Sequence, residues 1–94
     1  MDIYPAELVV GLKGRDAGRY FAVIEIIDRD YILICDGKTR KTDKPKKKKI
    51  KHVKALGFML DSVKDKLETN KKISNSDVRK AIRAAMGSYE ISKD

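Results

Sequence analysis

Ten lysines and arginines lie within one short segment of the chain, residues 38–54, and Asp43 is the one acid in this basic segment. The segment carries a formal charge of +9, whereas the whole chain of 94 residues carries +8. Lysine ammonium groups are compact point charges that contact phosphates and read bases poorly. The segment therefore predicts a polyanionic partner that is bound mainly by charge and shape. Its basic residues are Lys38, Arg40, Lys41, Lys44, Lys46, Lys47, Lys48, Lys49, Lys51 and Lys54.

Cys35 and His52, the one cysteine and the one histidine, are the side chains that could do covalent chemistry. Cys35 ends the apolar run Tyr31–Cys35, whereas a reactive thiol needs an electropositive and partly open site. One cysteine forms no internal disulfide, and one cysteine with one histidine makes no cluster of metal ligands. The sequence also lacks paired carboxylates in an apolar context and a phosphate-binding glycine loop. We therefore expect a structural cysteine, no enzyme activity, no metal and no cofactor. His52 would either touch phosphate beside the lysines or form a structural hydrogen bond.

Composition predicts one small folded domain. Hydrophobic residues make up 41% of the chain and charged residues 38%, too apolar for a disordered chain and too charged for a membrane protein. No apolar run approaches the ~20 residues of a membrane helix. The first residues, MDIYPAELVV, have no basic region or cleavage site of a secretory signal. We expect a cytoplasmic protein with no membrane partner.

The elements that must position the basic residues begin with three apolar runs. Residues 7–12, 19–27 and 31–35 are rich in β-branched and aromatic residues, which is typical of strands. The run at 19–27 is apolar at nearly every position, which predicts a strand covered on both faces or curled around a core. Three polar residues separate the second run from the third, which predicts a hairpin. The segment 14–18 (GRDAG) predicts a tight turn.

The basic segment itself divides into a loop and a strand. Its first half contains no apolar residue, and Pro45 removes a ladder donor, so a strand here is at a sheet edge or begins after the proline. Ile50, Val53 and Leu56 then interrupt the lysines. We predict that residues 48–55 form one final strand that directs apolar side chains into the core and leaves its lysines in water.

Two helical segments follow. The apolar spacing from Phe58 to Leu67 predicts a turn or a short helix that packs on the β domain. Residues 73–78 predict a helix start with Ser74 as the cap, Asp77 as its capping-box partner, and a hydrophobic staple. Gly87 would end this helix. Its apolar face, formed by Val78, Ile82, Ala85 and Met86, would dock on the β domain or, alternatively, in a groove of a partner. We therefore predict a mainly β domain over residues 1–57 and a helical extension over residues 58–94.

Residues 8–34 resemble a KOW motif, an RNA-binding strand-loop-strand unit in which one loop glycine is characteristic; here that glycine is Gly18. The order GRDAG, AVIEIIDRDYILICDG, KKKKIKHVKAL and ISNSDVRKAI is similar to that of the archaeal and eukaryotic large-subunit ribosomal proteins of the fourteen-e family, and to that of small bacterial KOW-domain proteins. The resemblance covers roughly residues 8–86. It implies a small SH3-like β-barrel, an RNA partner and a ribosomal setting with ribosomal proteins as neighbours.

By the same resemblance, Arg15 and Arg19 beside Gly18 are candidates for contacts with structured RNA. Alternatively, they are solvated turn residues, one of which pairs with Asp16. The full set of candidate RNA-binding residues is these two arginines, His52 and the ten basic residues of the segment. A second class of function stays open, namely a protein-interaction module whose lysines meet an acidic surface of a translation or transcription factor.

Overall fold

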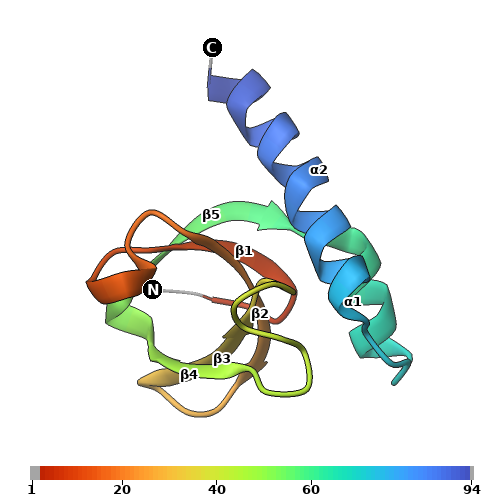
Figure 1. Cartoon of the computed structure of the whole chain (residues 1–94), viewed down its shortest axis with the longest axis horizontal. Helices are drawn as coiled ribbons and strands as arrows, with labels where there is room; N and C mark the ends of the chain where they lie inside the picture. Colours follow the sequence, from red (N-terminus) through yellow and green to blue (C-terminus); the bar gives the residue numbers. More distant parts are fainter. Residues whose placement is uncertain (1–2, 94) are drawn as a thin grey trace.

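The computed structural model of the protein describes residues 3–93, with the side chains of residues 3–87. Five antiparallel strands form one sheet in the order β4-β3-β2-β1-β5. The sheet curls around an interior, and two helices lie to one side of it (Figure 1). This architecture confirms the predicted mainly β, barrel-like fold with a C-terminal helix. The strands are β1 (Glu7–Gly11), β2 (Tyr20–Ile26), β3 (Tyr31–Cys35), β4 (Lys46–Lys49) and β5 (Val53–Met59).

Strand β2 is apolar at nearly every position because both of its faces are covered. Phe21 and Val23 point into the barrel, where they pack with apolar residues of β1, β3 and β5. Ala22 points outward into a second cluster, which includes Val63 and Val78 of the two helices. The predicted strand covered on both faces is therefore confirmed. The hairpin of β2 and β3 is confirmed as well.

The loop between β1 and β2 folds back on the barrel and contains a short 3-10 turn, η1 (Gly14–Asp16). A Cβ on Gly11 would lie 2.2 Å from the carbonyl oxygen of Asp16, so only glycine permits this approach. The Gly18 amide also donates to the Gly11 carbonyl at 2.9 Å. Because Gly11 follows Val9 on the inward face of β1, η1 lies over one end of the barrel interior.

The prediction of one strand over residues 48–55 is wrong. Strand β4 ends at Lys49, a 3-10 turn follows as η2 (Ile50–His52), and β5 begins at Val53. Since β4 and β5 lie at opposite edges of the sheet, the chain must turn between them to close the barrel. The Ile50 amide donates to the Asp30 carbonyl at 2.8 Å, and the His52 carbonyl accepts from the Leu12 amide at 2.8 Å. Strand β4 begins directly after Pro45 and lies at an edge of the sheet, which agrees with the expectation that a strand here is at an edge or begins after the proline.

Helix α1 (Asp61–Glu68) begins later than expected, because β5 continues to Met59. The last strand thus extends past residue 57, the predicted end of the β domain. Helix α2 (Asn75–Lys93) has the predicted capping box. The Asp77 amide donates to Ser74 Oγ at 3.0 Å, and the Ser74 amide donates to Asp77 Oδ2 at 2.9 Å. The predicted end at Gly87 is wrong, since α2 continues to Lys93 and Gly87 lacks the positive φ of a helix-ending glycine.

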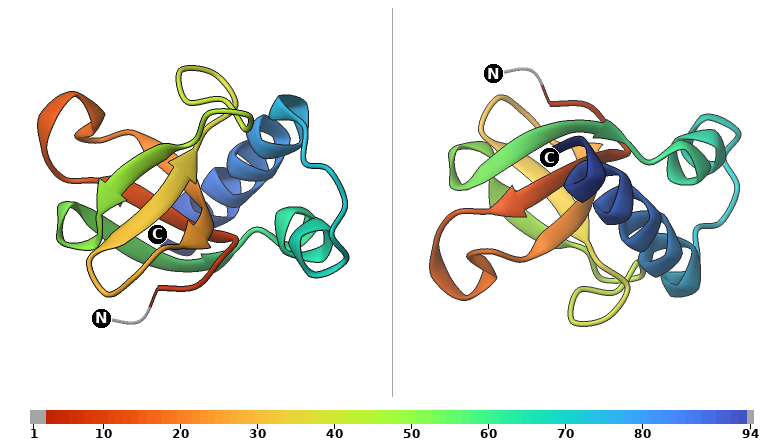
Figure 2. Two further views of the ribbon diagram at one scale, coloured as in Figure 1. Left: turned by 90° about the horizontal axis from the view of Figure 1, so that it is seen from below. Right: turned by 90° about the horizontal axis from the view of Figure 1, so that it is seen from above.

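The apolar face of α2 docks on the barrel, as predicted. Val78 is fully buried, and the predicted Ile82 and Ala85 pack against the same cluster. Ala81 joins this cluster, whereas Met86, which was predicted to belong to the face, is not part of it. Figure 2 shows the N-terminal half of α2 beside the loop that joins β3 to β4. Thr42 donates its amide to Asn75 Oδ1 at 2.8 Å, and Arg79 donates to the Gly37 carbonyl at 2.7 Å. No helix within residues 3–93 is long and apolar enough to cross a membrane.

Gly37 of this loop lies against α2, and it provides a test of the docking. A Cβ there would lie 2.4 Å from the Asn75 carbonyl oxygen, and its φ is +78°. We expect Gly37→Ala to lower the free energy of unfolding by about 2 to 3 kcal/mol, measured by urea denaturation. Gly57→Ala is the matched control, because Gly57 has φ +77° and open space around it. Equal losses in the two variants would show that the destabilisation comes from backbone strain alone and that the close approach of Gly37 to α2 contributes nothing to it.

Candidate nucleic-acid interface

The four consecutive lysines of β4 point alternately to opposite faces of the strand. Lys46 and Lys48 pair with Ile34 and Ile32, which face the barrel interior. Lys47 and Lys49 pair with the neighbouring positions of β3 and face outward. Directly opposed residues share a face of the sheet, so the strand register alone separates the lysines into two groups.

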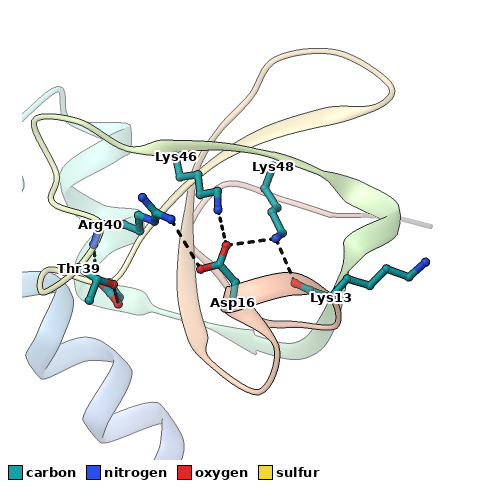
Figure 3. Close-up of polar contacts among 7 residues, drawn as sticks. Lys13, Asp16, Thr39, Arg40, Lys46 and Lys48 are labelled. Atoms are coloured by element: carbon teal, nitrogen blue, oxygen red, sulfur yellow. Dashed lines mark hydrogen bonds and ion pairs between the residues drawn. The ribbon is translucent and has the colours of Figure 1, made fainter.

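The inward lysines bind one buried carboxylate, Asp16 (Figure 3). Its Oδ2 lies 2.7 Å from Lys46 Nζ and 3.1 Å from Lys48 Nζ, and its Oδ1 lies 4.0 Å from a guanidinium nitrogen of Arg40. The Asp16 side chain is 2% exposed and that of Lys48 is 10% exposed. Burial by itself raises the pKa of Asp16, but the hydrogen bonds from Lys46 and Lys48 outweigh it and lower the pKa below its ordinary value. We call Asp16, Lys46 and Lys48 together the Asp16 clamp.

The Asp16 clamp corrects two expectations. The lysines of this region were expected to stay in water, yet Lys48 is buried and its Nζ also lies 3.5 Å from the Lys13 carbonyl oxygen. Asp16 was a candidate partner of Arg15 or Arg19, but its ion pairs among the described residues are with Lys46, Lys48 and Arg40. The clamp joins the β1–β2 loop to β4, and both arginines of this loop are exposed.

Outward-facing cations form a continuous stretch along β4, η2 and the start of β5. Lys47, Lys49, Lys51 and Lys54 are exposed, and none of them forms an ion pair with a described residue. His52 is half-buried among them. Burial and the charges of Lys13, Lys49 and Lys51 lower its pKa below the ordinary value, so the imidazole is neutral at pH 7. The positive charge of this face therefore comes from lysine.

A groove opens at the end of this face, beside the ring of Tyr31. Its lining comes from the β2–β3 turn and from the β4–η2 junction, and consists of Arg29, Asp30, Tyr31, Lys49, Ile50 and Lys51. Lys47 Nζ lies 4.5 Å from the centroid of the Tyr31 ring, a cation–π distance. The groove thus combines an aromatic ring with three cations.

The basic loop between β3 and β4 is ordered by Asp36. Its Oδ1 accepts the amides of Lys38 and Arg40 at 2.8 and 2.9 Å, and its Oδ2 accepts the Thr39 hydroxyl at 2.9 Å. Burial acts to raise the pKa of Asp36, but these hydrogen bonds outweigh it and lower the pKa. Lys38, Lys41 and Lys44 are exposed on this loop. Arg40 leans toward the Asp16 clamp, so the loop presents its lysines outward.

Four basic residues outside the predicted set also lie in these regions. Lys13 lies near His52, Arg29 lines the groove with Lys49 and Lys51, and Arg79 and Arg83 line a second groove with Lys38. The four-residue spacing of Arg79 and Arg83 on a predicted helix indicates a basic site, because it places two positive charges on one face of the helix. Nothing in the sequence pattern linked Lys13 or Arg29 to the basic segment.

Cys35 and His52 do not form a reactive pair. Cys35 is fully buried in the cluster between barrel and helices, and burial together with the charge of Asp36 raises its pKa to about 12. A thiol with this pKa is protonated at neutral pH and is a poor nucleophile. The prediction of a structural cysteine is confirmed. Among residues 3–87, no cluster of three potential metal ligands is present.

Known proteins similar to this chain come from the archaeal large ribosomal subunit. No protein-family model matches the chain. The large ribosomal subunit protein eL14 of Pyrobaculum arsenaticum is 32% identical over 78 residues, which are 83% of this chain and 69% of that protein. The eL14 protein of Pyrobaculum calidifontis is 31% identical over the same shares of both chains. These relatives agree with the family predicted from the order of the four motifs, and this chain therefore belongs to the eL14 family of large ribosomal subunit proteins.

Proposed function

We propose that this protein binds ribosomal RNA through the lysine face, which we define as the outward cations of β4, η2 and β5 (Lys47, Lys49, Lys51 and Lys54) together with Arg15 and Arg19. Two observations support the proposal. The similar proteins are named as components of the large ribosomal subunit. The six cations of the lysine face are exposed and form no ion pair with a described residue. In this role the protein is cytoplasmic, has ribosomal proteins as neighbours and performs no catalysis.

The observation that carries the proposal is the division of the lysines on β4. If the lysine run served only to keep the chain soluble, nothing would require half of it to pair with a buried carboxylate. Instead, Asp16 pairs with both lysines that the register turns inward, and the outward ones form no ion pair with a described residue. A rigid strand with unpaired ammonium groups on one face is suited to the regular phosphates of an RNA backbone.

The proposed contact also includes residues of two loops. Arg15 and Arg19 lie in the β1–β2 loop beside Gly18, which has open space around the position of a Cβ, so an RNA backbone can come close there. Their guanidinium groups can hold phosphates with paired hydrogen bonds. Lys38, Lys41 and Lys44 are exposed on the ordered loop between β3 and β4 and would contact a more distant part of the RNA. His52 would contribute a hydrogen bond.

A matched pair of double variants tests the proposal, because each removes two charges from the same four-residue strand. Replacing Lys47 and Lys49 with Gln should weaken the binding of all RNAs roughly tenfold to a hundredfold and reduce the salt slope by about two. Replacing Lys46 and Lys48 with Gln should leave that slope unchanged and instead lower the free energy of unfolding. Affinities are measured by fluorescence anisotropy with one structured RNA and one single-stranded RNA.

The outcome that would contradict the proposal is a salt slope that falls equally in the two double variants. That result would mean that RNA affinity depends on the total charge of the chain and not on its lysine face. The alternative of a protein-interaction module is not favoured by the relatives. It would gain support if wild-type protein bound RNA no better than the outward variant does.

A further inference from the structure

We propose that the groove beside Tyr31 holds one unpaired nucleotide of the bound RNA, with its base stacked on the tyrosine ring and its phosphate held by Lys49 and Lys51. This inference rests on the proposed RNA-binding function and makes it more specific. It adds a contact with a base to a surface whose other residues contact phosphates. The nucleotide would come from a bulge, a loop or a single strand, because a paired base cannot leave its stack without cost.

The lining of the groove matches the two parts of a nucleotide. Tyr31 and Ile50 supply an aromatic ring and an aliphatic side chain, and Arg29, Lys49 and Lys51 supply three cations against one acid, Asp30. Proteins that bind single-stranded RNA combine these elements, because a base has a π-face and its backbone carries charge. An inorganic anion would use the three cations but not the ring of Tyr31. A peptide side chain would not use the ring and all three cations together.

The groove is held in shape by the backbone. Asp28 Oδ1 accepts the amides of Asp30 and Tyr31 at 2.8 and 2.9 Å, which shapes the β2–β3 turn. The Ile50 amide donates to the Asp30 carbonyl at 2.8 Å and joins this turn to η2. Both sides of the groove are therefore tied together before any ligand arrives, which lowers the ordering cost of binding.

Tyr31 stays available although a lysine lies over its ring. Lys47 Nζ is 4.5 Å from the ring centroid, but Lys47 does not line the groove. A base in the groove would therefore meet a part of the ring that Lys47 leaves open. Tyr31 is half-buried, and its strand pairs with a neighbour on each side, so its backbone is held in place. By contrast, Tyr4 is 56% exposed, and its groove has one lysine, Lys64, balanced by Glu68.

The test uses two RNA hairpins that differ only in one bulged nucleotide, 2-aminopurine, whose fluorescence is quenched when it stacks. Wild type should bind the bulged hairpin more tightly than the paired one and quench the probe. Tyr31→Leu should lower the affinity for the bulged hairpin about tenfold or more and abolish quenching, with the paired hairpin and the salt slope unchanged. Tyr31→Phe should retain both properties, and Tyr4→Leu is the control for an exposed tyrosine elsewhere.

A crosslink in the wild-type protein gives a second readout that does not depend on the folding of a variant. With 5-iodouridine in the bulge, irradiation should attach the RNA at Tyr31, as mapped by mass spectrometry. Equal loss of both hairpins in Tyr31→Leu, or a crosslink only at other residues, would overturn the nucleotide site and leave the lysine face intact. Failure of wild type to bind either hairpin would overturn the proposed RNA-binding function itself.

Discussion

RNA affinity should fall on the order of a thousandfold when monovalent salt is raised from about 50 to about 200 mM. The lysine face presents six exposed cations, and each phosphate that one of them neutralises releases counterions from the RNA. Six such contacts give a slope of about −5 in a plot of log affinity against log salt, and contacts from Lys38, Lys41 or Lys44 would make the slope steeper. The inward lysines, Lys46 and Lys48, are not counted because both already pair with Asp16.

The measurement is a salt titration of the binding of one structured RNA, repeated with Arg15→Gln/Arg19→Gln. Removing both arginines should reduce the slope by about two and weaken a structured RNA more than a single strand. A slope near zero in the wild-type protein would exclude a phosphate-driven interface. Equal weakening of every RNA by the arginine variant would remove the proposed structure-specific role of the β1–β2 loop.

Asp16→Asn should lower the free energy of unfolding by about 3 kcal/mol, because it leaves buried Lys48 without its counter-charge. Lys46 can move toward water, since its side chain is 31% exposed, whereas that of Lys48 is 10% exposed. The loss is measured by urea denaturation at pH 7. Asp43→Asn is the matched control, since it changes the net charge equally at an exposed position of the basic loop.

The pH dependence and a second substitution sharpen this test. The pKa of Asp16 in the folded protein lies below the ordinary 3.8, so its stabilising effect is complete above that value and is lost as the pH falls through the lower folded pKa. The difference between wild type and Asp16→Asn should therefore shrink in acid. Adding Lys48→Met to the variant should restore part of the stability, because the orphaned charge is then gone. No recovery would show that the carboxylate acts other than by pairing with Lys48.

Local patterns were sufficient for the hairpin of β2 and β3, the edge position after Pro45 and the capping box at Ser74, because each depends on neighbouring residues. The predictions were wrong where contacts between residues distant in sequence determine how an element ends. The break at Ile50 follows from closure of a barrel whose two edge strands must be joined. The continuation of α2 through Gly87 shows that glycine permits a helix to end but does not force it, since its cost inside a helix is only about 1 kcal/mol.

By itself, the sequence determined that this protein is a small basic β domain of a ribosomal family, because composition, motif order and local propensity are properties of the chain alone. It could not show which lysines face the solvent. Four adjacent lysines are indistinguishable in sequence, and the register of β4 against β3, together with Asp16 some 30 residues away, assigns two to the clamp and two to the lysine face. Only the tertiary structure decided this, because strand pairing sets the face of every second residue and brings the carboxylate to them.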